Sequence, residues 1–207
     1  MTTQNKNWDN SLWNKFQQGD NDALGELFQE RFRELYFYGL KLVPVAELVK
    51  DTIQDLFTDL WSRKEKVKEI ANINAYLMVS LRRELLRRAS KIRTQTDLDE
   101  ASSQYFTFSS EDFIIGSETE LETRNKLVAG LRHLTSRQRE VIVLRFKHEM
   151  EFKEIAQVMD LNVQSVRNLL FRALEKLREE MNVGDSVDKQ DVGLVLFAFF
   201  KEKIKFS

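Results

Sequence analysis

The sequence contains no cysteine and a single proline, Pro44, in 207 residues. Without cysteine the chain has no disulfide, no thiolate metal site and no cysteine nucleophile, and this is typical of a reducing, cytoplasmic setting. Glycine is also scarce, at seven residues, which excludes collagen-like and Pro/Gly-rich chains. With 42% hydrophobic and 31% charged residues, we expect the chain to fold into globular domains.

Long apolar runs are missing as well. The N-terminus has no apolar stretch behind a basic start, so we predict no signal peptide. The longest apolar stretch, 192–200, is about half of what a bilayer span needs, so we expect no membrane insertion. The histidines, His133 and His148, are isolated and lie in no metal-ligand or nucleophile spacing. We therefore expect no catalytic residues, no metal and no cofactor.

An excess of one charge is also lacking, since 32 Lys and Arg face 33 Asp and Glu. Any attraction to nucleic acid must come from uneven placement of these charges. The segment 82–93 holds six cations and one acid, Glu84, whereas 94–123 holds eight acids and no cation. Most of the acidic segment is rich in Ser, Thr and Gln and has neither helical nor strand period, which indicates a linker.

These patterns predict an all-α fold of two small helical domains joined by an acidic linker, the second a helix-turn-helix domain. The predicted parts are a helical domain at 8–93, a flexible linker at 94–120, a helix-turn-helix domain at 121–182 and a C-terminal extension at 183–207. The extension holds the apolar stretch, which would be a sticky surface if left in water. Such a segment can be buried on the protein itself or on a partner, and we expect 191–204 to form a short helix on the chain's own domains, either completing the second domain's core or restraining that domain.

In the first domain the apolar spacing predicts helices at about 22–42, 46–63 and 73–93, with Pro44 ending the first and Asn72 capping the third. One face of the third helix carries Tyr76, Ser80, Arg83, Arg87 and Lys91 at helical spacing. Cations that neutralise phosphates beside an aromatic ring suit single-stranded nucleic acid. A solvated basic face, with the tyrosine ring against a neighbouring helix, would give the same pattern.

In the second domain a short helix at 152–160, a turn at Leu161-Asn162 and a long helix after it form a helix-turn-helix pattern. A helical pair in a bundle would show the same apolar spacing. Asp160 stands where such motifs often have glycine, although Asp tolerates the left-handed conformation better than most residues. The outward face of the long helix offers hydrogen-bonding groups for base edges and phosphates, namely Gln164, Ser165, Arg167, Asn168 and Arg172.

Six motifs together resemble the sigma-70 family of bacterial RNA polymerase initiation factors, in the compact two-domain form called extracytoplasmic-function sigma factors. The first domain carries GDNDALGELFQERFRELY, DTIQDLFTDLW and NAYLMVSLRRELLRR. The second carries LTSRQREVIVLRF, EFKEIAQVM and NVQSVRNLLFRALEKLR. Each motif is only moderately specific by itself, whereas all six in this order, on either side of a linker, make a strong match.

The resemblance implies roles for three groups of residues. The residues implied to contact core RNA polymerase are Asp51, Gln54, Asp55 and Asp59. Phe57 and Trp61 of the same helix are expected to lie in the interior of the domain. The residues implied to open the −10 promoter element and bind its single strand are Lys68, Asn72, Tyr76, Ser80, Arg83, Arg87 and Lys91. Reading the −35 element as duplex falls to Gln164, Ser165, Arg167, Asn168 and Arg172.

The expected partners are therefore core RNA polymerase and promoter DNA, with an anti-sigma factor as a further candidate. Arg83 stands where many relatives have Asn, and Leu169 where they have Arg, so fine promoter specificity does not transfer. A transcription regulator with a helix-turn-helix output domain and an unrelated helical sensor domain is the alternative. A DNA-processing enzyme such as a recombinase is a second alternative, but the sequence lacks the positioned nucleophile or metal carboxylates that such an enzyme needs.

Overall fold

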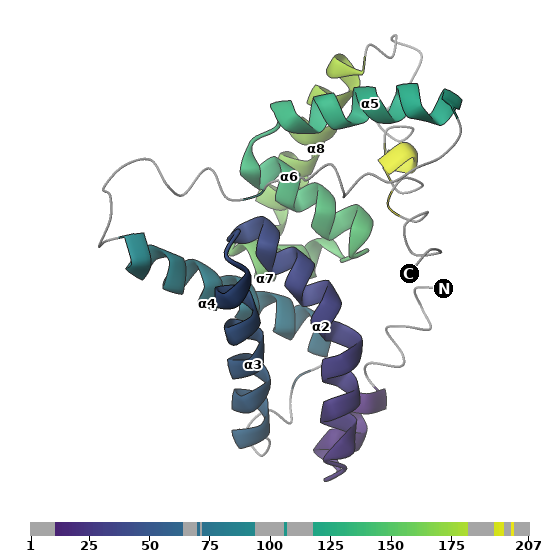
Figure 1. Cartoon of the computed structure of the whole chain (residues 1–207). Coiled ribbons are helices and arrows are strands. Elements are labelled where there is room, and N and C mark those ends of the chain that lie inside the picture. The colour runs from purple at the N-terminus through teal and green to yellow at the C-terminus, as the bar shows by residue number, and fades with distance from the viewer. Residues whose placement is uncertain are drawn as a thin grey trace. The chain divides into compact units, whose positions relative to one another are not determined.

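The computed structural model describes residues 11–63, 70, 72–93, 106, 118–181, 193–196 and 200, and the side chains of 92–93 and 118–124 lie outside this description. Every element within the described residues is helical, which confirms the predicted all-α fold (Figure 1). The chain divides into two compact units, Met1–Asp99 and Glu100–Ser207. Lys68 and nearly all of the acidic segment lie outside the described residues.

The first unit is built on three long helices, α2 (Asp22–Leu42), α3 (Ala46–Ser62) and α4 (Ile73–Arg93), each of which packs against the other two. Side chains ahead of two of these helices bind the first backbone N–H groups. The Asp20 carboxylate accepts a hydrogen bond from the backbone N–H of Asp22 at 3.1 Å. The Asn72 side-chain oxygen accepts one from the N–H of Ala75 at 3.1 Å, which caps α4 as predicted.

The core of the first unit departs from the prediction in two places. Residues 11–17 are helical and bury Leu12, Trp13 and Phe16, although the sequence analysis assigned no helix there. Trp61 is 45% exposed rather than internal, because it lies about 100° round α3 from the buried Leu60. Its ring lies beside that of Phe16, with 6.2 Å between centroids. Phe37 of α2 is exposed in the same way, and its neighbour Tyr38 is buried instead.

A glycine sets the distance between the helices of this unit. A Cβ atom on Gly39 of α2 would lie 2.6 Å from Cγ1 of Val49 in α3 and 3.2 Å from Cδ1 of Leu85 in α4. Real carbon atoms do not approach so closely, and Val49 is fully buried and β-branched, so its side chain has little room to move. The close contact of the three helices therefore requires glycine at this position.

We predict that Gly39→Ala destabilises the first unit by about 1–3 kcal/mol, the usual cost of overpacking a core. Urea unfolding followed by circular dichroism measures the loss. The matched control is Gly25→Ala, because a Cβ there meets nothing within 4 Å and a helical alanine is favoured over glycine. Equal stability of the Gly39→Ala variant and the parent chain would contradict the packing argument.

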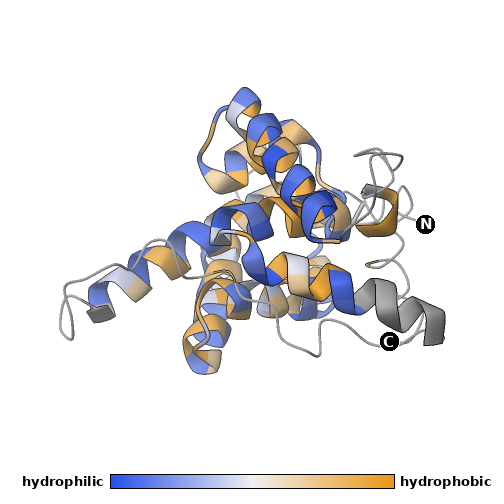
Figure 2. Ribbon diagram, turned by 90° about the horizontal axis from the view of Figure 1, so that it is seen from above, coloured by the Kyte–Doolittle hydropathy of each residue, from blue (hydrophilic) through white to orange (hydrophobic). Residues whose placement is uncertain are grey.

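The second unit is organised around α8 (Val163–Glu180), which packs against α5 (Glu118–His133), α6 (Ser136–Ile142) and α7 (Phe152–Met159). A π-helical turn, η2 (Val143–Lys147), continues α6 toward α7. Apolar and polar residues alternate along these helices, as the orange and blue of Figure 2 show. A capping box begins α6, since the Thr135 hydroxyl accepts from the N–H of Gln138 and the Gln138 side chain accepts from the N–H of Thr135.

Phe106, which falls within the predicted linker, is part of the packing of the second unit. Its side chain is 1% exposed, and its carbonyl oxygen accepts a hydrogen bond from Nε of Arg139 at 2.5 Å. Nη1 of Arg139 also donates to the carbonyl of Leu134 at 2.7 Å. Burial lowers the pKa of this guanidinium from its usual value. Arg139 therefore links the start of α6 to the backbone of Phe106.

Part of the C-terminal extension also packs on the second unit. Residues 193–196 are helical, and Leu196 and Phe200 are buried while Leu194 is exposed. A Cβ on Gly193 would lie 3.5 Å from the ring of Phe146 in η2, which is ordinary van der Waals contact. For these residues the expected burial on the chain itself is confirmed, and the rest of 191–204 lies outside the described residues.

Candidate nucleic-acid interface

The predicted DNA-facing row of α4 becomes more exposed toward the C-terminal end of the helix. Tyr76 and Ser80 are half-buried, whereas Arg83, Arg87 and Lys91 are exposed. The opposite side holds the helix in the unit, with its apolar side chains buried against α2 and α3: Ile73, Ala75, Leu77, Met78, Leu81, Leu85 and Ala89. One helix thus combines a buried apolar stripe with a cationic outer row, so its charged side chains are held on a rigid support.

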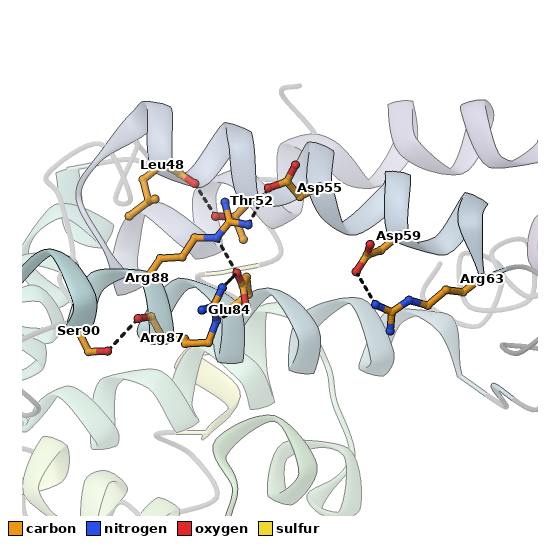
Figure 3. Close-up of polar contacts among 9 residues, drawn as sticks. All are labelled: Leu48, Thr52, Asp55, Asp59, Arg63, Glu84, Arg87, Arg88 and Ser90. Carbon is orange, nitrogen blue, oxygen red and sulfur yellow. Dashed lines mark hydrogen bonds and ion pairs between the residues drawn. The ribbon is translucent and has the colours of Figure 1, made fainter.

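Two arginines of α4 share a single carboxylate, that of Glu84. Arg87 donates to it from Nε at 2.8 Å and from Nη2 at 2.5 Å. Arg88 donates from Nε to Glu84 at 2.6 Å, and its Nη2 reaches across to the Asp55 carboxylate on α3, also at 2.6 Å (Figure 3). This cluster of Asp55, Glu84, Arg87 and Arg88, the α3–α4 ion cluster, contains two charges of each sign.

The α3–α4 ion cluster changes the acidity of its central carboxyl. Hydrogen bonds from Arg87, followed by those from Arg88, lower the pKa of Glu84 from 4.5 to about 2. The same hydrogen bonds raise the pKa values of both guanidinium groups. Because Glu84 is held ionised in the folded chain more strongly than in the unfolded chain, its contribution to stability is complete above pH 4.5 and disappears as the pH falls toward 2.

The acidic face of α3 is open to solvent. Asp51, Gln54, Asp55 and Asp59 are all exposed and lie along one side of the helix, opposite the buried Ile53 and Leu60. Asp55 belongs to the α3–α4 ion cluster, and Asp59 pairs with Arg63 at 3.5 Å (Figure 3). This face can bind a partner with complementary positive charge.

The helix-turn-helix of the second unit has the expected geometry at its turn. Asp160 ends α7 in the left-handed conformation, with φ 53° and ψ 55°, as its residue type allows. Asn162 then caps α8, because its side-chain oxygen accepts from the N–H of Ser165 at 2.7 Å. Ile155 and Ala156 of α7 and Val166 of α8 are buried. The turn therefore fixes the first residues of α8 in space.

The predicted base-reading residues lie on the outer side of α8. Gln164, Arg167, Asn168 and Arg172 are exposed, and Ser165 is half-buried beside the cap. Nε2 of Gln164 donates to Oδ1 of Asn168 at 3.1 Å, one turn along the helix. Both side chains are exposed, and each amide has further donors and acceptors beyond this hydrogen bond, of the kind that can pair with base edges.

An aromatic ring that the sequence analysis did not single out supports this row. The guanidinium carbon of Arg167 lies 5.4 Å from the centre of the Phe152 ring, and that of Arg145 lies 5.0 Å from it. Nη1 of Arg145 also donates to the carbonyl of Met150 at 2.8 Å. Phe152 is the first residue of α7 and falls outside the buried stripe, and this position was the available signal that its ring serves an exposed contact.

Two other features of the described residues bear on chemistry. No group of three or more His, Cys, Asp or Glu side chains among them is placed to hold a metal ion. No helix in the described parts of the chain is both long and apolar enough to cross a membrane. The predicted site residues that the structure describes lie in three places: the α3 face and the α4 row on the first unit, and the α8 row on the second.

The comparisons with known proteins agree with these features. Residues 130–179, which include the helix-turn-helix, match the family model for sigma-70 region 4. The RNA polymerase sigma-E factor of Streptomyces coelicolor is 27% identical over 154 residues, covering 70% of this chain and 78% of that protein. The RNA polymerase sigma factor SigV of Bacillus subtilis is 25% identical over 156 residues, covering 74% and 87%.

Two solved structures share the fold. CnrH, in complex with the cytosolic domain of CnrY, superposes with a TM-score of 0.54 at 20% identity, covering 86% of this chain and 99% of that one. The sigma factor RpoE of Bartonella quintana, in complex with the anti-sigma factor NepR, gives a TM-score of 0.52 at 19% identity, covering 77% and 98%.

Fold and surfaces together define an all-helical protein of two units, the second a helix-turn-helix domain of the sigma-70 region 4 type. Its residues 130–179 match the sigma-70 region 4 family, and the chain as a whole is similar, over about 70% of its length, to RNA polymerase sigma factors.

The ionisation of Glu84 gives a measurable pH dependence. We predict that the difference in melting temperature between the parent chain and Glu84→Gln is constant above about pH 4.5 and shrinks as the pH falls from 4.5 to about 2. Because the two variants are compared at each pH, the contributions of the other carboxyl groups to the pH dependence cancel. Glu47→Gln is the control, because its exposed ion pair with Lys50 contributes little. A difference that did not change between pH 5 and 2 would contradict the assignment.

The Phe152 ring should couple energetically to Arg167. A double-mutant cycle of Phe152→Leu and Arg167→Gln, measured by urea unfolding, should give a coupling of about 0.5–1 kcal/mol, the usual size of an exposed cation–π pair. Leucine keeps the apolar volume and removes only the ring. A parallel cycle with Arg172→Gln, another exposed arginine of α8, should give no coupling. Strictly additive effects in the first cycle would show that the ring does not hold Arg167.

Proposed function

We propose that this chain binds core RNA polymerase, directs it to specific promoters and helps to open the −10 region. It does so in the cytoplasm, by binding and without catalysis of its own. The observation that carries the proposal is the region 4 match, which falls on a helix-turn-helix whose recognition helix presents its polar row to solvent. The curated relatives extend beyond that domain to 70% or more of the chain, which supports the same role for the first unit.

Each part of the chain has a proposed task. Residues 8–93 form the domain that binds polymerase and the −10 element, and 121–182 form the domain that binds the −35 element. The acidic segment 94–120 connects them, and 183–207 is an extension that the sigma family does not require. The partners are core polymerase, promoter DNA and an anti-sigma factor, the last by analogy with the complex of RpoE and NepR.

The acidic face of α3 is the proposed polymerase contact. Asp51, Gln54, Asp55 and Asp59 leave the buried side of the helix free to hold the unit together, and three of the four carry negative charge. Such a face selects a basic surface and accelerates the encounter with it. Exposed carboxylates cost little to keep in the free protein, and pairing with cations of a partner offsets the cost of removing water from them.

The cationic row of α4 is the proposed contact with the −10 strand. Arg83, Arg87 and Lys91 would neutralise phosphates, while Tyr76 and Ser80, nearer the start of the helix, would meet the unpaired bases. Asn72 already caps the helix through its side-chain oxygen, so its contribution to strand binding is through its amide nitrogen. Lys68, outside the described residues, extends the row in the sequence.

The outer row of α8 is the proposed −35 reader. Gln164, Ser165 and Asn168 offer hydrogen bonds to base edges, and Arg167 and Arg172 to phosphates or guanine. The half-buried Leu169 stands among these residues and offers an apolar contact for a thymine methyl group. The specificity of the −35 contact therefore depends on amide groups more than on a central arginine.

Run-off transcription with purified core polymerase on a library of genomic promoters tests the proposal. Co-migration of the chain with core polymerase and transcription from a defined promoter set are the expected results. An Asp51→Asn and Asp55→Asn double variant should bind polymerase more weakly, whereas Glu30→Gln, which removes an exposed acid from α2, should not. A chain that binds duplex promoter DNA but not polymerase would instead be a helix-turn-helix regulator with a helical sensor domain.

The two DNA contacts should respond differently to substitution. Gln164→Ala or Asn168→Ala should change the preference between −35 sequences by about 1–3 kcal/mol for each lost base contact. Arg87→Gln should weaken DNA engagement on all promoters and reduce its dependence on salt. Competition binding of the holoenzyme to promoter variants, over a series of salt concentrations, separates the two effects. Uniform loss on every promoter from both sets of variants would contradict the division.

A further inference from the structure

The α3–α4 ion cluster joins two surfaces to which the proposed function gives different partners. Asp55 belongs to the face proposed for polymerase, and Arg87 belongs to the row proposed for the −10 strand. Between them lie Arg88, which contacts both Asp55 and Glu84, and Glu84, which contacts both arginines. Figure 3 shows the four side chains in one continuous series across the gap between α3 and α4.

From this series we propose that Glu84 and Arg88 are positioning residues that couple polymerase docking on α3 to the availability of Arg87 for DNA phosphate. The inference rests on the proposed function for its two partners. Its physical basis is competition, because Oε1 of Glu84 accepts from Nε of Arg88 at 2.6 Å and from Nη2 of Arg87 at 2.5 Å. One carboxylate oxygen serves both arginines, so a stronger hold by one weakens the hold by the other.

In the free chain the hydrogen bond to Asp55 limits how strongly Arg88 binds Glu84. Nη2 of Arg88 is directed to Asp55, and only its Nε reaches Glu84, while Arg87 holds Glu84 by two hydrogen bonds. The Arg87 guanidinium is thereby neutralised on the surface where the −10 strand would bind. Its side chain is 50% exposed, so it can leave Glu84 for a phosphate without any movement of the helix.

A cation on polymerase that pairs with Asp55 removes one partner of Arg88. The Arg88 guanidinium can then turn both of its donors to Glu84, in the two-pronged geometry that arginine and carboxylate prefer. Arg87 loses its acceptor and adds one uncompensated positive charge to the α4 row. Docking on α3 therefore strengthens phosphate binding on α4, through side chains that the structure already holds in contact.

Coupling of this kind is reciprocal. A phosphate that takes Arg87 leaves Glu84 to Arg88, which in turn weakens the hold of Arg88 on Asp55 and frees Asp55 for polymerase. Asp55 is 62% exposed, and exposed ion pairs are weak, so the expected coupling is about two- to five-fold in affinity in each direction. A coupling of that size favours the complete complex over either partial one.

The test uses the full chain and a fluorescein-labelled single-stranded oligodeoxynucleotide of mixed sequence, with affinity measured by anisotropy at low salt. Asp55→Asn imitates the loss of Asp55 to a partner and should raise affinity about two- to five-fold. Asp51→Asn removes the same charge from the same face one turn earlier, and it reports the general effect of a lost negative charge. The gain from Asp55→Asn should exceed that from Asp51→Asn.

The decisive measurement is the dependence of that gain on Arg87. In an Arg87→Gln background the extra gain from Asp55→Asn should vanish, because no arginine remains to be released. In an Arg88→Lys background the extra gain from Asp55→Asn should also vanish, because a lysine ammonium lacks the arginine fork that would take Glu84 away from Arg87. Equal gains from Asp55→Asn and Asp51→Asn, or a gain that persists without Arg87, would overturn the coupling. Thermal melting of each variant confirms that it is folded.

A second arm separates this inference from the proposed function. Binding of the parent chain to core polymerase is measured with and without saturating oligonucleotide, and the oligonucleotide should raise the affinity about two- to five-fold, an effect that Glu84→Gln should abolish. If the chain does not bind polymerase at all, the proposed function fails. If it binds and the oligonucleotide leaves the affinity unchanged, the coupling alone fails.

Discussion

Six positive charges within twelve residues of one helix repel one another, and the first unit depends on how α4 accommodates them. The apolar stripe anchored by Leu77, Leu81 and Leu85 holds the helix against α2 and α3, so burial on one side opposes the repulsion on the other. Glu84, the single acid of the segment, lies where it neutralises two neighbouring arginines. Without that carboxylate the helix would carry its highest charge density at the point where it crosses α3.

The second unit positions its exposed polar row by backbone geometry and apolar packing. Its exposed row on α8 is mostly amide and hydroxyl groups, and the helix is positioned by backbone geometry: a left-handed Asp160, a capping Asn162 and the buried Val166. Polar side chains on such a base lose little conformational entropy when they bind, because the helix beneath them is already fixed. The stack of Arg145 and Arg167 on Phe152 extends that order to two charged side chains.

Much of this was predictable from the sequence, because long amphipathic helices have a strong period. The bounds of α2 and α4, the Asn72 cap and the conformation of Asp160 followed from local rules. The exposure of Trp61 and Phe37 did not, because large apolar side chains at a helix surface are assigned inward by hydropathy alone. The helix at 11–17 was too short for its period to be recognised. The pairing of Asp55 with Arg88 joins residues 33 apart, and no local pattern gives such a contact.

The burial of Phe106 shortens the free chain between the end of α4 and the second unit. If the interdomain segment were free as far as the start of α5, the 24 residues between Arg93 and Glu118 could span at most about 85 Å. With Phe106 fixed to the second unit, only 12 residues remain between it and Arg93, and the longest possible span falls to about 45 Å. A single buried ring thus roughly halves the length of chain that can extend between the end of α4 and the second unit.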